Sequence, residues 1–169
     1  RRYCAISPGA LVVGISWDSA ARHGGNKRMS LECWDAILNL PGITFVSLQY
    51  GVGRDDPEIQ RLGLSTTLVV DDEVDALKDL DTSAAQVAAM DLVITVSNTT
   101  AHLAGAQGIP AWVLLPDGPG CFWYWFRDRS DSPWYPSMRL FRQPHPRNWR
   151  PVVADVARAL VELSSKGQL

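Results

Sequence analysis

The chain contains only three cysteines among its 169 residues, Cys4, Cys33 and Cys121. Three thiols this far apart in the sequence do not suggest a disulfide framework or a zinc site, and they favour a reducing compartment. No apolar run approaches the roughly 18 residues that a membrane-spanning helix needs, and no signal peptide is visible. We therefore expect a cytoplasmic protein without a membrane span.

Short motifs of several enzyme classes are also missing. No G-x-G-x-x-G turn follows the first apolar run and no G-x-x-x-x-G-K-[ST] loop occurs, which weakens NAD-type and P-loop functions. H-E-x-x-H, C-x-x-C and G-x-S-x-G are absent as well. The acidic run Asp71-Asp72-Glu73 is able to bind a divalent metal, but a solvated acidic turn explains it better, so no metal site is predicted.

The charges nearly balance, with 16 basic and 18 acidic residues and a formal net charge of −2. This balance argues against a broad surface for nucleic acid or anionic membranes, although it allows a small local basic site. The apolar content of 46% suits one domain with a substantial core.

Short apolar runs alternate with helical patterns along most of the chain. Strands are predicted at residues 11–17, 43–48, 67–70, 92–96, 111–115 and 138–141, and helices at 30–40, 58–62, 82–90, 99–107 and 151–163. Asp81 or Thr82 is expected to cap the third of these helices, and 74–80 is a further helical candidate. The pattern predicts an α/β, Rossmann-like three-layer sandwich with a mainly parallel sheet of about six strands. Residues 1–10 are interpreted as a linker and 11–169 as the domain.

The segment around Ser97, Asn98, Thr99 and Thr100 is the strongest candidate for a binding site. It joins an apolar strand to a helix, and ligands of open α/β sheets bind beyond the carboxyl ends of strands. The free N–H groups of the helix and the hydroxyls of this turn suit an anion such as a diphosphate. The alternative is that Asn98 or Thr99 simply caps the helix.

Basic residues lie in the loop after the first strand, at Arg22, His23, Lys27 and Arg28. Such a loop is able to neutralise phosphates across from a helix N-terminus, Lys27 as a point charge and Arg28 through two hydrogen bonds. A solvated surface loop is the alternative. His102, one turn into the later helix, either faces a ligand or packs beneath the loop.

Aromatic residues are concentrated late in the chain, at 122–126 and at Trp134 and Tyr135. They are able to wall a sugar or base site. Seven rings exceed what one ligand needs, so covering the sheet edge or packing against a partner domain is the favoured interpretation.

An ordered set of motifs between residues 12 and 163 resembles a known group of proteins. It comprises Val13-Gly14-Ile15-Ser16-Trp17, Asn26-Lys27-Arg28, Asp91–Val96, Ala101-His102-Leu103-Ala104-Gly105-Ala106, Gly108-Ile109-Pro110, Trp112–Pro116, Asp131–Ser137 and Leu140–Gln143. In this order they resemble the C-terminal, nucleotide-sugar-binding half of GT-B glycosyltransferases. The similarity is greatest to bacterial domains that follow tetratricopeptide repeats and are related to the ADP-heptose transferases (glycosyltransferase family 9-like), and more distant to protein O-GlcNAc transferases.

The resemblance implies roles for individual residues. It places Lys27 and the run Ser97-Asn98-Thr99-Thr100, with His102, on the donor diphosphate, and residues 71–83 beside the base and ribose. Ser97 stands where the heptose-transferase pattern has Asp, whereas Asn98-Thr99-Thr100 is similar to the His-Thr-Thr run of the O-GlcNAc transferases. Further candidates for the nucleotide site are Ser16, Arg22, Arg28, Gln49 and Asp81.

The function expected from this resemblance is donor binding in a glycosyltransferase. The substrate is a nucleotide diphosphate sugar, no cofactor is needed, and an upstream acceptor lobe or tetratricopeptide repeats are the expected partners. No general base is assigned, because the acceptor lobe usually supplies it, and we expect no turnover by these 169 residues alone. The alternative is a non-catalytic Rossmann-like interaction module attached to helical repeats.

Overall fold

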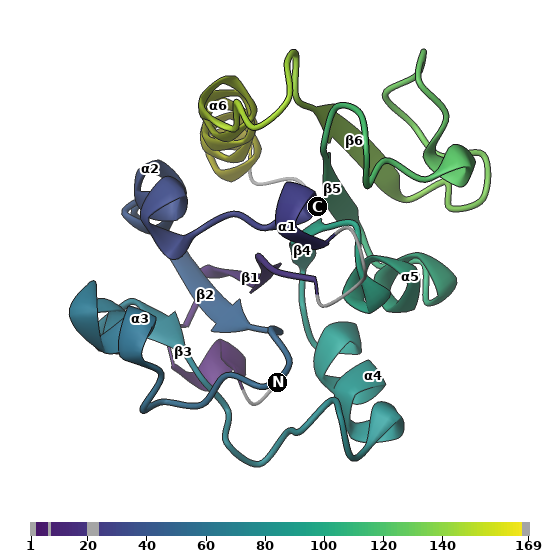
Figure 1. Ribbon diagram of the computed structural model, residues 1–169. Coiled ribbons are helices and arrows are strands. Elements are labelled where there is room, and N and C mark those ends of the chain that lie inside the picture. Colours follow the sequence, from purple (N-terminus) through teal and green to yellow (C-terminus); the bar gives the residue numbers. More distant parts are fainter. Residues whose placement is uncertain (1–2, 7, 20–23, 167–169) are drawn as a thin grey trace.

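The structure is a computed structural model that describes residues 3–6, 8–19 and 24–166 (Figure 1). Its centre is a six-stranded sheet in the order β3-β2-β1-β4-β5-β6, and every strand pairs in parallel with its neighbours. This order is typical of Rossmann-like doubly wound folds. The strands are β1 (Leu11–Ser16), β2 (Ile43–Ser47), β3 (Leu68–Val69), β4 (Leu92–Val96), β5 (Ala111–Leu115) and β6 (Met138–Arg142).

Helices cover both faces of this sheet (Figure 1). They bury two separate apolar cores, one on each face. Successive strand residues alternate between the cores, as for Val12 and Val13 in β1 and for Leu92 and Val93 in β4. One face carries η2 (Leu31–Trp34), α2 (Asp35–Leu38), α3 (Pro57–Arg61) and α6 (Arg150–Lys166), and the other carries α4 (Leu80–Ala88) and α5 (Thr99–Ala106). The predicted three-layer α/β sandwich is therefore confirmed.

Several helix boundaries differ from the sequence-based prediction. The helix expected at 30–40 begins as the 3-10 turn η2, and residues 74–79 are irregular, with a turn at 76–78, instead of helical. The loop predicted after β1 contains a short helix, α1 (Gly24–Lys27). In α4 the cap is Asp79, whose carboxylate accepts hydrogen bonds from the N–H groups of Asp81 and Thr82. The cap prediction was wrong because the helix starts at Leu80, earlier than its alanine-rich stretch suggested.

Part of the segment interpreted as a linker packs against the domain. Residues Tyr3–Ala5 form a 3-10 turn, η1, and Tyr3 is buried in the core beneath α4 and α5. Its hydroxyl donates to Asp71 Oδ2 over 2.7 Å and accepts from Gln86 Nε2 over 3.1 Å. The buried tyrosine thereby anchors the acidic turn after β3 to α4.

Two short 3-10 turns, η3 (Leu64–Thr66) and η4 (Trp123–Trp125), complete the elements. Among the described residues, none of the helices combines the length and the apolar character required to cross a membrane.

Candidate functional site

A cavity of about 430 Å³ lies beyond the carboxyl ends of β1 and β4. The chain connections run in opposite directions from these two neighbouring strands, so this is the topological switch point where ligands of open α/β sheets bind. The lining comes from segments far apart in the sequence: Ser19, Lys27, Leu48, Tyr50, Ala76, Leu77, Leu80, Ser83, Ser97–Thr100, His102, Leu103, Phe122 and Tyr124. The structure thus brings Lys27, the 97–100 turn and His102 to one cavity.

Lys27 is a buried cation in the wall of this cavity, with only 1% of the residue exposed. Its Nζ donates to the main-chain oxygen of Ser97 over 2.9 Å and lies 4.1 Å from the centre of the Phe122 ring. No carboxylate among the described residues forms an ion pair with it. Burial lowers the pKa of Lys27, because the charged form loses its hydration.

The N-terminus of α5 opens onto the same cavity, and Asn98 caps it. Its Oδ1 accepts from the N–H of Thr100 over 3.0 Å and from Thr95 Oγ1 over 3.0 Å. Its Nδ2 donates to Ser16 Oγ and to the main-chain oxygen of Asp18. The protein itself thus engages both the oxygen and the nitrogen of this amide, and the capping interpretation describes this side chain well.

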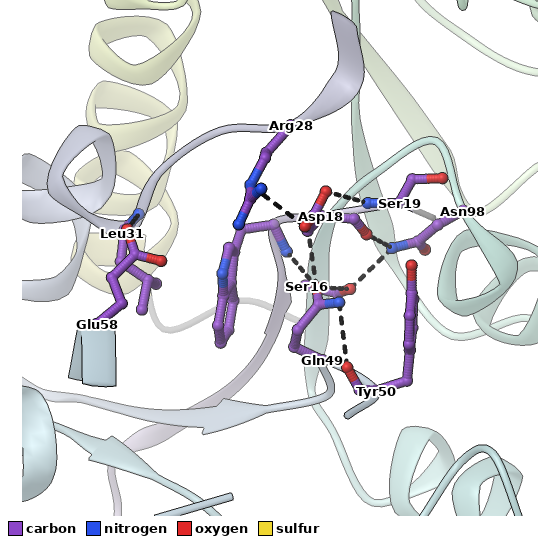
Figure 2. A network of polar contacts seen from close by, with 10 residues as sticks. Ser16, Asp18, Ser19, Arg28, Leu31, Gln49, Tyr50, Glu58 and Asn98 are labelled. Carbon is purple, nitrogen blue, oxygen red and sulfur yellow. Dashed lines mark hydrogen bonds and ion pairs between the residues drawn. The ribbon is translucent and has the colours of Figure 1, made fainter. Parts of the chain in front are cut away.

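Figure 2 shows how Gln49, in the loop after β2, continues this network to Ser16 at the end of β1. Gln49 Oε1 accepts from Ser16 Oγ over 2.9 Å and from the N–H groups of Trp17 and Asp18 over 3.0 and 2.9 Å. Backbone N–H groups at this turn hold phosphate in many dinucleotide folds. Here the Gln49 amide occupies them, so Ser16, Gln49 and Asn98 brace the crevice between the two strands.

The remaining residues of the 97–100 turn differ in their exposure. Ser97 is buried, and its Oγ accepts a hydrogen bond from Trp125 Nε1 over 2.8 Å. Thr99 is exposed and Thr100 is buried, and both line the cavity. The two threonines and the first turn of α5 are therefore the polar groups that this turn offers to a ligand.

His102 lies in an aromatic cage at the side of the cavity. Its ring stacks on Trp125 with centroids 5.4 Å apart and meets the rings of Tyr124 and Tyr135 edge to face. Its Nδ1 is 3.0 Å from the Tyr135 hydroxyl oxygen. Burial and the nearby charge of Lys27 lower the pKa of His102, which favours the neutral ring.

The other candidates among the described residues do not line this cavity. Arg28 is exposed and pairs with Asp18 across 3.3 Å (Figure 2), and Asp81 is exposed at the start of α4. Ser16 lies behind Asn98, and Gln49 faces a neighbouring cavity. Arg22 and His23 lie outside the described residues.

That neighbouring cavity, of about 240 Å³, lies between the ends of β2 and β3. Both cavities are lined by Leu48, Tyr50, Ala76 and Leu77, so they adjoin. Residues 70–77 form much of its wall, within the segment that the resemblance places beside a base and ribose. Tyr50 and Leu77 were not singled out from the sequence, although the loops that contain them follow predicted strands.

Within the parts of the chain that the structure describes, no group of three or more His, Cys, Asp or Glu residues is placed to hold a metal ion.

No protein-family model matches the chain. Among curated proteins it is similar to Protein FlbA of Caulobacter vibrioides, with 34% identity over 163 residues. The match covers 95% of this chain and 26% of FlbA, so the chain spans about a quarter of the length of the curated relative that it matches.

Proposed function

We propose that this chain binds the diphosphate of a nucleotide sugar in the 430 Å³ cavity, as the donor-binding lobe of a GT-B glycosyltransferase. The proposal combines the motif resemblance with a cavity at the switch point of a Rossmann-like sheet. Fold alone does not decide among the many functions that such sheets support, so the argument depends on the site.

The observation that carries the proposal is the environment of Lys27. A buried ammonium group is costly unless an opposite charge compensates it, and no described carboxylate does so here. The ammonium adjoins the first turn of α5, where the helix dipole is also positive. An anion bound in the cavity compensates the charge of the ammonium and the positive end of the helix dipole at once.

A diphosphate fits this arrangement better than a single carboxylate. Lys27, the first turn of α5 and the hydroxyls of Thr99 and Thr100 offer several donors around one space. Charge that builds on a leaving nucleoside diphosphate is then stabilised by groups already in position, which is electrostatic catalysis. The adjoining smaller cavity supports placing the base and ribose beside residues 71–77.

The acceptor and its activation are assigned to a region outside this chain. The proposed partners are an acceptor lobe or tetratricopeptide repeats, and we expect no sugar transfer by the chain alone. We also propose a cytoplasmic location, with which the free thiols of Cys33 and Cys121 are compatible.

Calorimetric titration with ADP-, GDP- and UDP-sugars tests the proposal. We expect one of the three series to bind, and Lys27→Ala or the double variant Thr99→Ala, Thr100→Ala to weaken that binding. Arg158→Ala is the control, because it removes an exposed basic side chain of α6 that lines neither of the two cavities. Equal binding by all variants contradicts the assigned site.

A second candidate, an interaction module, is favoured by one surface feature. Trp123, Trp134 and Phe126 are exposed, and the Trp134 ring lies 6.4 Å from that of Trp123 and 6.5 Å from that of Phe126, centroid to centroid. Exposed aromatic patches of this kind often mark protein contacts. This candidate is favoured if no nucleotide sugar binds, either to the chain alone or when the proposed acceptor lobe is also present.

A further inference from the structure

The ring of His102 has two nitrogens with different surroundings. Nδ1 faces the Tyr135 hydroxyl at 3.0 Å, whereas the ring itself lines the cavity. With Nδ1 occupied, Nε2 is the nitrogen left for a ligand. The protonation of Nε2 therefore decides whether His102 offers a hydrogen-bond donor or an acceptor there.

The Tyr135 hydroxyl is the group placed to set that protonation. Within the described residues, it contacts no acceptor other than His102 Nδ1. When the hydroxyl donates its proton to Nδ1, the neutral ring carries its own proton on Nε2. Among the described residues, the charged and titratable groups that face the ring are Lys27 and the phenols of Tyr124 and Tyr135, and none of these is a carboxylate that favours imidazolium.

Close packing holds Tyr135 in place. Gly105 lies one turn after His102 in α5, and a Cβ there would approach Tyr135 Cγ to 2.5 Å. The glycine thereby allows the tyrosine ring to lie directly against the helix. Stacking on Trp125 fixes the plane of the imidazole.

We propose that Tyr135 is a positioning residue that holds His102 as its neutral, Nε2-protonated tautomer and so aims a hydrogen-bond donor at the diphosphate. Only one part of this proposal, the identity of the ligand, rests on the proposed function. The tautomer itself belongs to the free protein and is measurable without nucleotide. A donor at Nε2 adds to the donors of Lys27 and α5 without adding a second buried charge.

The test is long-range ¹H–¹⁵N NMR of the histidines in the nucleotide-free chain, with the His102 signals assigned from a His102→Gln variant. We expect Nε2 to carry the proton in the unmodified chain near pH 7. In Tyr135→Phe we expect both tautomers to be populated and the titration midpoint to change. An unchanged tautomer in Tyr135→Phe overturns the proposal.

The second readout is a double-mutant cycle of dissociation constants, measured with the nucleoside diphosphate that the unmodified chain binds best. Tyr135→Phe is expected to raise the Kd about three- to tenfold, the range of one modest hydrogen bond. In the His102→Gln background the same substitution is expected to have little further effect. Equal weakening in both backgrounds contradicts a role through His102. If no nucleoside diphosphate binds, the proposed function fails, and the NMR result still decides the role of Tyr135.

Discussion

Replacing Lys27 by methionine separates a ligand-binding role from a structural one. The substitution keeps an unbranched side chain in the buried wall and removes the charge. Two effects on the free protein oppose each other. The desolvation cost of the ammonium disappears, but the main-chain oxygen of Ser97 loses its donor, at a cost of about 1–3 kcal/mol. We therefore expect the free energy of unfolding without ligand to change by no more than about 2 kcal/mol.

Binding is expected to respond differently. A hydrogen bond to a charged group contributes about 1.5–3 kcal/mol, so the Kd for a nucleoside diphosphate should rise by roughly 10- to 150-fold. Chemical denaturation and calorimetry on the same preparations measure both quantities, with Arg158→Met as the charge-matched control, because this exposed residue of α6 lines neither cavity. Global unfolding of Lys27→Met, or an unchanged Kd, would refute the reasoning.

The free energy of unfolding without ligand and the affinity for a diphosphate are expected to change with pH in opposite directions. Because the pKa of Lys27 is lowered in the folded chain, the ligand-free protein gains stability as pH rises through that folded value toward 10.5. Over the same range the ammonium loses its charge, so affinity for a diphosphate should fall. Lys27→Met is expected to remove both trends.

Three further predictions concern the surroundings of the cavity. Gly105→Ala should lower the free energy of unfolding by about 1–2 kcal/mol, since the new methyl group meets Tyr135 and Met138. Asn98→Ala should lower it by about 2–3 kcal/mol, because a helix cap and the bonds to neighbouring loops are lost together. Because the pKa of His102 is lowered, its contribution to stability is present above pH 6.5 and is lost as pH falls through the folded value.

Denaturant titration checks all three. Gly53→Ala is the matched control for Gly105→Ala, because a Cβ at Gly53 would meet only Asp72 Oδ1, at an ordinary contact distance of 3.5 Å. An unchanged midpoint for Gly105→Ala or Asn98→Ala contradicts the packing or capping described above. For His102, the contradicting result is a His102→Gln variant whose free energy of unfolding falls with decreasing pH below 6.5 as steeply as that of the unmodified chain.

The fold was predictable because its strands are short apolar runs that end at turn residues. Runs such as 92–96 and 111–115 became β4 and β5 with the predicted bounds. The position of the cavity was predictable from the rule that ligands of open α/β sheets bind beyond the strand ends at the switch point. Both features depend on local patterns in the sequence.

Other features of the site depend on the order of the strands and on distant loops. Lys27 lies in a polar stretch, and its burial is due to the ring of Phe122 and the turn at Ser97. Similarly, the bonds among Ser16, Gln49 and Asn98 require β1 to lie between β2 and β4. Neither spacing nor composition indicates such contacts, so the sequence suggested these residues as ligand contacts without showing which of them brace the site.

The most direct test is a crystal structure of the chain with the nucleoside diphosphate that it binds best. We expect the two phosphates in the 430 Å³ cavity, within hydrogen-bond distance of Lys27 Nζ and of the first turn of α5. A nucleotide bound elsewhere, or phosphates that contact neither Lys27 nor α5, contradicts the assignment of this cavity to the donor diphosphate.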